Sequence, residues 1–281
     1  MSDPTTQSRK IEKPFSPIFF LLIIVLTLSV FAGILKITFP NVWAIQFGAH
    51  WYEIIFVFII AHFLASFVEF FFHRYFLHAY PFAFLRRFYR QHTLHHSLTS
   101  VRLVTLSDKK VISSHYPILE EAQYEASYFP WFSLSIFIFI SLPLMGLIQW
   151  IMPTTPILIG TILAITWSLI LYEFIHAVEH LSYDNFWRSK INNRRWGRIW
   201  RLIYSFHIRH HAYIKCNEAV GGFFGIPLPD FIFGTYISSK TLLIDGTTAN
   251  EKDFSTPMPC LLIRFLDQLS TRRMKKLKTV S

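Results

Sequence analysis

Long apolar stretches with few charged side chains recur four times along the chain, at about residues 15–38, 51–72, 130–152 and 156–175. Each is close to the roughly 20 residues that an α-helix needs to cross a bilayer. Short segments join the first two stretches and the last two, whereas longer polar segments follow the second and the fourth. The pattern predicts an all-α integral membrane protein whose four transmembrane helices form two hairpins.

The distribution of Lys and Arg orients these hairpins. Apart from Lys36, every Lys and Arg lies in residues 9–13, 74–110 or 187–278. Cytoplasmic segments of membrane proteins carry an excess of these residues, so we expect the three stretches and both termini in the cytoplasm. The net charge of +10 then indicates membrane-facing surfaces, and no nucleic-acid partner is expected. The membrane would be the endoplasmic reticulum in a eukaryote and the inner (plasma) membrane in a bacterium.

The chain divides into one membrane domain (15–258), a cytoplasmic N-terminal tail (1–14) and a basic C-terminal tail (259–281). Apolar residues recur at helical spacing in the C-terminal tail: Leu261, Leu262, Phe265 and Leu269. This spacing, with basic residues behind it, predicts an amphipathic helix on the membrane surface. Residues 97–129 are polar, and we expect them to form a lid or a surface loop.

Ten of the thirteen histidines gather in four short boxes, HRYFLH, HTLHH, HAVEH and HIRHH. They are His73, His78, His92, His95, His96, His176, His180, His207, His210 and His211. Neutral imidazole is the commonest nitrogen ligand for iron, zinc and copper. The two cysteines form no thiolate motif, so imidazole would supply the ligands. One ion rarely takes more than about six ligands, so the number of histidines predicts two metal ions.

The spacing within the boxes bears on their geometry. Intervals of three and four residues return side chains to one face of a helix, which fits the last three boxes. His73 and His78 are five residues apart, and on an α-helix they would point about 140° away from each other. We therefore expect a wide turn or a helix end there, or ligands that serve two different metals.

The same order of features occurs twice along the chain. Each half has a transmembrane hairpin, a paired-histidine box at the inner end of its second span, and then an HxxHH box. The pattern predicts a cytoplasmic helical cap that holds the histidine-rich di-metal site. Two ions bound by neutral nitrogens would carry a large positive charge, so nearby carboxylates are expected as partners of the ligands. The candidates are Glu69, Glu173, Glu179 and Asp184.

The order HxxxxH, HxxHH, HxxxH, HxxHH with four spans resembles the fatty acid hydroxylase/sterol desaturase superfamily of integral membrane oxygenases. The segment NEAVGGFFGIPLPDFIFGTY is similar to the closing stretch of that family, in which an Asp precedes Phe-Gly-Thr. Here these residues are Asp230, Phe233, Gly234 and Thr235. The resemblance runs from about residue 69 to residue 236, and the first hairpin matches only in layout. Pro229, where an aromatic residue is common, and residues 97–129 depart from the pattern and leave the substrate open.

The resemblance implies that the ten boxed histidines bind two iron ions, which zinc can replace in purified or crystallised protein. It implies that this centre is the catalytic group and that it uses O2 to hydroxylate or desaturate a C–H bond of a lipid from the bilayer. The lipid would be a fatty acyl chain, a sphingoid base, a sterol or a carotenoid. Electrons are expected from a separate b-type cytochrome, or from a ferredoxin with its reductase, because no haem-binding HPGG segment is present.

Three alternatives stay open. Acyl-lipid desaturases with three histidine boxes are the nearest, although the additional HxxxH box after the fourth span favours the hydroxylase superfamily. HAVEH also fits H-x-x-E-H, the zinc-peptidase motif in which Glu179 would act as base, but this leaves most boxed histidines unexplained. A metal transporter would need ligands near the middle of the spans, where only His62 lies. We expect His62 to form a hydrogen bond within the bundle, and His50 and His115 to be surface residues.

Overall fold

Helices dominate the computed structural model, which describes residues 16–239 and 241–280. Four of the described helices are long and apolar enough to cross a membrane: Pro17–Thr38, Trp51–Leu77, Ser133–Ile151 and Ile157–Glu179. They coincide with the four predicted spans, so the prediction of a mostly helical protein with four helices able to cross a membrane is confirmed. The predicted tail of residues 1–14 lies outside the described residues.

The first hairpin consists of α1 (Pro17–Thr38) and α3 (Trp51–Phe72). The connection between them is not a plain loop, because it forms a short helix, α2 (Pro40–Gly48). Ser16 caps α1, since its hydroxyl accepts a hydrogen bond from a first-turn backbone N–H. Ile24 is the one buried residue that α1 has, so nearly all of its apolar side chains face outward, as a lipid-facing helix requires.

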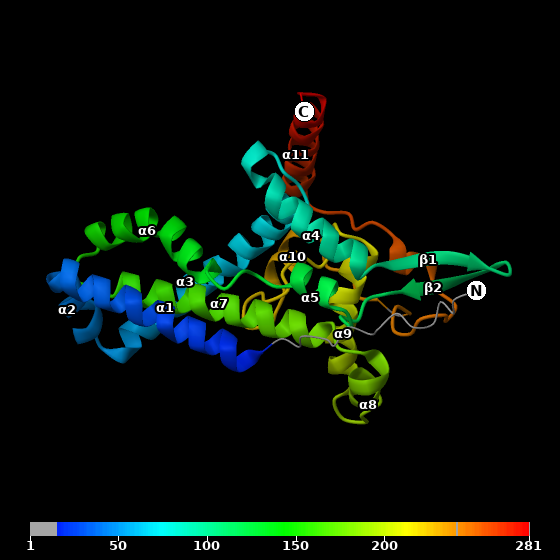
Figure 1. Ribbon diagram of the computed structural model, residues 1–281, viewed down its shortest axis with the longest axis horizontal. Helices are drawn as coiled ribbons and strands as arrows, with labels where there is room; N and C mark the ends of the chain where they lie inside the picture. Colours follow the sequence, from blue (N-terminus) through cyan, green and yellow to red (C-terminus); the bar gives the residue numbers. More distant parts are fainter. Residues whose placement is uncertain (1–15, 240, 281) are drawn as a thin grey trace, which may run out of the picture.

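The second hairpin consists of α6 (Ser133–Ile151) and α7 (Ile157–Glu179), and α7 packs along α3. Gly160 of α7 allows this close approach, because a Cβ at that position would lie 2.6 Å from the side chain of Val57. Figure 1 shows α1, α3 and α7 running along the long axis of the molecule, with the short helices α4, α5, α9 and α10 gathered at one end.

That end is assembled from short helical elements that follow the two hairpins. They are η1 (His73–Leu77), η2 (Ala83–Leu85), α4 (Arg86–Leu98), α5 (Glu121–Ser127), η3 (Tyr183–Trp187), α8 (Arg188–Ile191), α9 (Gly197–Ala212), α10 (Leu228–Phe233) and η4 (Glu251–Phe254). Gly197 lets α9 begin directly against the backbone carbonyl of Ile191, where a Cβ would collide. The fourth histidine box therefore lies on a helix whose first turn is fixed by packing.

Residues 97–129 form more structure than the lid or surface loop that was expected. They contain the antiparallel hairpin of β1 (Val101–Leu106) and β2 (Lys109–Ser114), which projects from the histidine-bearing end in Figure 1. At the base of the hairpin Val101 and Ile112 are buried in one apolar cluster with Tyr116. This core anchors the segment next to the histidine boxes.

The C-terminal segment forms α11 (Leu261–Val280), which confirms the predicted amphipathic helix. Its apolar row is exposed along the outer face: Leu261, Leu262, Phe265 and Leu269. Ile263 on the opposite face is fully buried in a cluster with Phe70 and Ala219. In Figure 1, α11 crosses the direction of the spans rather than following it.

Candidate metal centre

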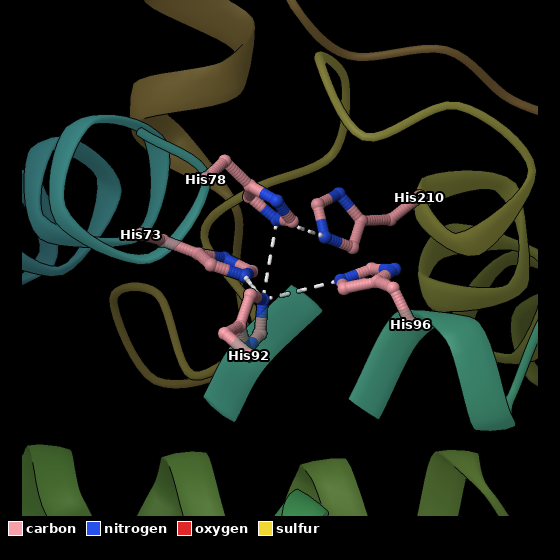
Figure 2. A group of neighbouring side chains, drawn as sticks. All are labelled: His73, His78, His92, His96 and His210. Carbon is pink, nitrogen blue, oxygen red and sulfur yellow. Dashed lines mark hydrogen bonds between the residues drawn. The ribbon is translucent and has the colours of Figure 1, made fainter. Parts of the chain in front are cut away.

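The ten boxed histidines come together as two groups of five. In each group, one ring nitrogen per residue lies within 4.8 Å of every other. The first group, shown in Figure 2, contains His73, His78, His92, His96 and His210. The second group contains His95, His176, His180, His207 and His211. Buried histidine clusters of this size could hold metal ions.

The two halves of the chain contribute to these groups symmetrically. The paired box after the first hairpin supplies only the first group, and the paired box after the second hairpin supplies only the second. Each HxxHH box gives its first and last histidine to the group of its own half and its middle one to the other group. For the box on α4 the middle histidine is His95, and for the box on α9 it is His210. The repeat in the sequence is therefore a repeat in the site.

A π-helical turn explains how His73 and His78 join the same group. Residues 73–77 form η1, and the N–H of His78 donates to the carbonyl of His73 at 3.0 Å, an interval of five residues. The wider π turn brings side chains five positions apart onto one face, and such turns are frequent at functional sites. The expected wide turn is confirmed, and the alternative that the two histidines belong to different groups is wrong.

Backbone carbonyls orient two rings of the first group. Nδ1 of His73 lies 2.6 Å from the carbonyl oxygen of Glu218, and Nδ1 of His210 lies 2.7 Å from that of Cys216. A carbonyl oxygen can only accept, so each of these Nδ1 atoms carries the proton and donates it. In the neutral ring Nε2 is then unprotonated and presents its lone pair.

These lone pairs meet at the centre of the first group. Nε2 of His92 lies 2.9 Å from Nε2 of His73 and 3.1 Å from Nε2 of His96. Nε2 of His78 lies 3.0 Å from Nε2 of His210 and 3.2 Å from that of His92. One ring N–H on His92 cannot donate to three neighbouring nitrogens, so acceptor atoms are left facing one another (Figure 2). A cation at their centre satisfies them all, and the residues fit a metal ion.

The second group repeats this arrangement. Two of its Nδ1 atoms also contact backbone carbonyls, at 2.6 Å from His180 to Tyr116 and at 3.0 Å from His211 to Thr99. Its Nε2 atoms also converge, at 3.3 Å from His176 to His95, 3.2 Å from His207 to His180 and 3.1 Å from His211 to His207. Both groups therefore present fixed, inward-facing nitrogen lone pairs.

Burial keeps these rings neutral. It lowers the pKa of His180 to about 3. Burial, and then the charge of neighbouring imidazoles, holds the pKa well below its usual value in His78, His92, His95, His96, His207, His210 and His211. A neutral imidazole has one unprotonated nitrogen, so near pH 7 the groups are sets of neutral nitrogen donors that could bind a metal, and not sets of cations.

Of the four expected carboxylates, Glu179 lies beside the second group and Glu173 lies on the helix that carries the third box. Oε2 of Glu179 is 3.8 Å from Nδ1 of His207, on the outer side of that ring and away from the converging nitrogens. Glu173 precedes the third box on α7 and accepts a hydrogen bond from the backbone N–H of Phe129 at 2.9 Å. Glu179 thus lies next to His207 without a hydrogen bond to it, whereas Glu173 holds the chain that leads into α6.

The other two expected carboxylates have different partners. Glu69 accepts hydrogen bonds from the backbone N–H groups of Gly221 and Gly222 at 2.7 and 3.0 Å, so it fixes a loop. The expectation for Asp184 was wrong. The π turn η3 directs its carboxylate to the surface, where it is 66% exposed and pairs with Arg188. Spacing along the chain placed Asp184 near the third box but could not show which way the turn faces.

The buried carboxylate of Asp230 supports the first group. Its spacing from the histidine boxes had not marked it as a partner of the ligands. The Asp230 side chain accepts hydrogen bonds from the N–H of Glu218 at 2.9 Å and of Ala219 at 2.8 Å, and from the hydroxyl of Thr235 at 2.6 Å. These bonds fix the turn whose Glu218 carbonyl accepts from His73. The resemblance had marked Asp230 and Thr235 only as matching residues, and their contacts now give them a role.

Arg74, next to the first box, forms a second support that sequence reasoning missed. Its guanidinium donates to Glu218 at 2.5 Å and to both carboxylate oxygens of Asp267 at 2.7 and 2.9 Å. The side chains of Arg74 and Glu218 are 3% and 0% exposed. An arginine at the end of an apolar span was the available signal, because a charge there needs a partner.

The segment of residues 97–129 also contributes to the second group. The Ser127 hydroxyl lies 2.8 Å from Nδ1 of His95. The ring of Tyr116 stacks on His180 with 4.3 Å between centroids. The segment therefore packs directly against the second group and does not lie over it as a separate loop.

The three histidines outside the boxes behave as expected. His62 is fully buried; its Nδ1 lies 2.9 Å from the Ser168 hydroxyl, and its Nε2 accepts a hydrogen bond from the N–H of Phe224 at 3.1 Å. His50 and His115 are exposed. The hydrogen bond within the bundle and the two surface positions are confirmed.

No protein-family model, curated protein or solved structure matches this chain.

Proposed function

We propose that this protein is a membrane-bound di-iron oxygenase that hydroxylates or desaturates a C–H bond of a lipid. The observation that carries the proposal is the pair of five-histidine groups at the ends of two apolar spans, with lone pairs converging in each. Imidazole-rich sites with few carboxylate ligands suit iron, copper or zinc. Zinc has no redox chemistry, whereas iron can couple O2 reduction to attack on an unactivated C–H bond, and the boxes resemble those of the di-iron fatty acid hydroxylase/sterol desaturase superfamily.

Two bound iron ions would supply the reduction of O2 and the removal of hydrogen from the lipid. Residues of the protein would position the lipid next to the ions. Tyr172, one helical turn before the third box, stacks on His176 with 5.5 Å between ring centroids, and Phe129 packs on Tyr172 at 5.3 Å. These rings form an apolar wall on the membrane side of the second group, which excludes water and suits an acyl or sterol chain. Where the chain is held against that wall would decide between an alcohol and a double bond.

The contacts of Glu179 argue against the zinc-peptidase reading. A base in an H-x-x-E-H site must face the metal-bound water, but the Glu179 carboxylate lies behind His207, on its Nδ1 side. The position of the groups argues against a transporter, which needs its ligands near the middle of the spans. Both groups instead use residues at or beyond the ends of α3 and α7.

Lipid analysis tests the proposal. Cells that express the wild-type chain should accumulate a lipid that has gained one oxygen or lost two hydrogens, compared with cells that express His95→Ala. Equal lipid profiles, with expression confirmed for both chains, would contradict an oxygenase. Metal accumulation that depends on the chain, without lipid change, would instead identify a transporter.

We further propose that both termini and all four boxes lie in the cytoplasm, because basic residues flank only those segments. In a background without Cys260, single cysteines at the exposed positions Asn41 and Thr154 should react with an impermeant maleimide in intact cells. A cysteine at exposed Ser97 should react only after permeabilisation. Labelling of Ser97 in intact cells would place the histidine groups on the outer side.

The reductant would dock on the same face. Four exposed arginines surround the start of α9, the helix that carries the fourth box: Arg194, Arg195, Arg198 and Arg201. Small electron-carrier proteins are often acidic, and complementary charge speeds their encounter more than it tightens binding. This surface therefore suits an acidic b-type cytochrome or ferredoxin.

Charge reversal tests this docking. Arg195→Glu with Arg198→Glu should slow reduction of the metal by the donor about tenfold at low salt while metal content stays unchanged. Raising the ionic strength should slow the wild type in the same way, because screening shortens the reach of the field. Arg102→Glu with Lys109→Glu, an equal charge change on the β1–β2 hairpin, serves as the control. Equal rates in both double variants would assign the α9 arginines to lipid contact instead.

A further inference from the structure

A small groove lies between α11 and the turn that follows the fourth histidine box. Its volume is about 280 Å³, and it is lined by Lys215, Asp267, Gln268, Thr271 and Arg272. Four of these residues project from one flank of α11, between its buried face and its exposed apolar row. None of them belongs to the histidine groups.

The chemistry of the groove favours an anion. Lys215 and Arg272 are exposed cations, and neither forms an ion pair with a carboxylate of the described residues. Gln268 and Thr271 add neutral hydrogen-bond donors. The one acidic group, Asp267, already has partners, because it shares the charge of Arg74 with Glu218 and accepts a hydrogen bond from the Tyr75 hydroxyl at 3.0 Å. The groove therefore presents two cations that are not paired with a carboxylate, with neutral donors between them.

The position of the groove indicates the source of that anion. α11 crosses the direction of the spans at the histidine-bearing end, as a helix at the membrane surface does (Figure 1). Its apolar row of residues 261, 262, 265 and 269 is exposed. If that row enters the acyl region, the adjoining basic flank lies at the depth of the phosphate groups.

An aromatic side chain in the apolar row supports this placement. Phe265 is 62% exposed on the outer face of α11, between Leu262 and Leu269. An exposed aromatic ring beside a basic flank is typical of a helix at the boundary between headgroups and acyl chains. The source that fits the groove best is therefore a lipid of the surrounding bilayer.

We propose that this groove is a binding site for the phosphate headgroup of an anionic phospholipid. Lys215 and Arg272 contact the phosphate, and the acyl chains pack along the exposed apolar row of α11. The proposal does not depend on the oxygenase reaction, because the groove and the two histidine groups share no residue.

The groove is joined to the first histidine group by direct contacts. Asp267 at its edge binds Arg74, Arg74 binds the Glu218 side chain at 2.5 Å, and the Glu218 carbonyl accepts from His73. The Lys215 carbonyl also accepts a hydrogen bond from Arg74, at 3.2 Å. A headgroup that bridges Lys215 and α11 therefore stiffens the support of His73, so a bound phospholipid should slow metal loss from the first group.

Lipid retention tests the site directly. The full-length chain, purified in detergent and given equal phosphatidylglycerol and phosphatidylcholine, should retain phosphatidylglycerol preferentially in native mass spectrometry. Arg272→Gln should lower that retention about fivefold. Arg273→Gln is the matched control, because Arg273 lies one residue away over the ring of Phe82, outside the groove. Equal losses of phosphatidylglycerol in the two variants would overturn the site. Displacement of phosphatidylglycerol by inorganic phosphate at the same concentration as the lipid would show that the groove binds free phosphate, which would also overturn the phospholipid site.

Metal release tests the connection to His73. In the zinc-loaded protein, a chelator should remove one of the two ions more slowly in nanodiscs that contain phosphatidylglycerol than in phosphatidylcholine alone. Asp267→Asn should abolish this difference while phosphatidylglycerol is still retained. Identical release in both lipids for the wild type would overturn the connection, and the retention experiment would then decide the site by itself.

Discussion

His210→Ala is expected to leave about one metal ion per chain and no measurable turnover, and His95→Ala is expected to do the same. Each residue belongs to a different group of five, so each change removes one nitrogen from one site and leaves the other site complete. The loss opens a position to water and leaves four lone pairs to hold the ion. Metal analysis of the purified variants, together with lipid turnover, measures both effects.

His115→Ala is the control, because His115 is exposed and belongs to neither group. It should keep both ions and the full turnover. Loss of both ions from His95→Ala and from His210→Ala alike would contradict two independently formed sites. Retention of both ions in each variant would contradict the assignment of these residues as ligands.

Arg74→Met is expected to destabilise the protein by about 3–5 kcal/mol, because the substitution leaves the carboxylates of Glu218 and Asp267 without their buried partner. Glu218 would lose its ion pair in a fully buried position, and α11 would lose the contact of its Asp267 with Arg74. Methionine preserves most of the side-chain volume, so the lost charge and hydrogen bonds dominate the effect. The midpoint of thermal unfolding in detergent, followed by tryptophan fluorescence, should fall by several degrees or more.

Arg188→Met provides the comparison. Arg188 also pairs with a carboxylate, that of Asp184, but both side chains are more than half exposed. Surface pairs of this kind contribute about 1 kcal/mol or less. Equal shifts in the two variants would show that the buried pair at Arg74 has no special part in holding the first box and α11 together.

The spans and the boxed histidines were accessible from the sequence because both depend on local composition and spacing. A run of about 20 apolar residues has few alternatives to a membrane helix. Ten histidines in four boxes likewise indicate a shared site wherever the helices lie. The amphipathic character of α11 followed in the same way from four apolar positions.

The division of the histidines into two groups was not accessible, because it depends on how helices cross. Spacing put His92, His95 and His96 on one helical face, yet α4 passes between the two groups and His95 turns to the second. The pair of His73 and His78 required a π turn, which the five-residue interval suggested without excluding the alternative.

The partners of the ligands were the least predictable part. Four of the Nδ1 atoms donate to backbone carbonyls, which every residue carries and no sequence pattern marks. Sequence proximity therefore favoured carboxylates such as Asp184, whose side chain faces solvent. Arg74 and Glu218 lie far apart in the chain, and only folding brings them together beside His73.

The most direct test of the account is the metal content of the protein as the cell loads it. The protein should be purified from membranes without chelator and under exclusion of O2, and its iron and zinc should be measured against chain concentration. Two groups of five histidines predict about two ions per chain, predominantly iron, in a preparation that modifies lipid. One ion per chain, or none, in a preparation that is fully active would contradict the two-metal centre.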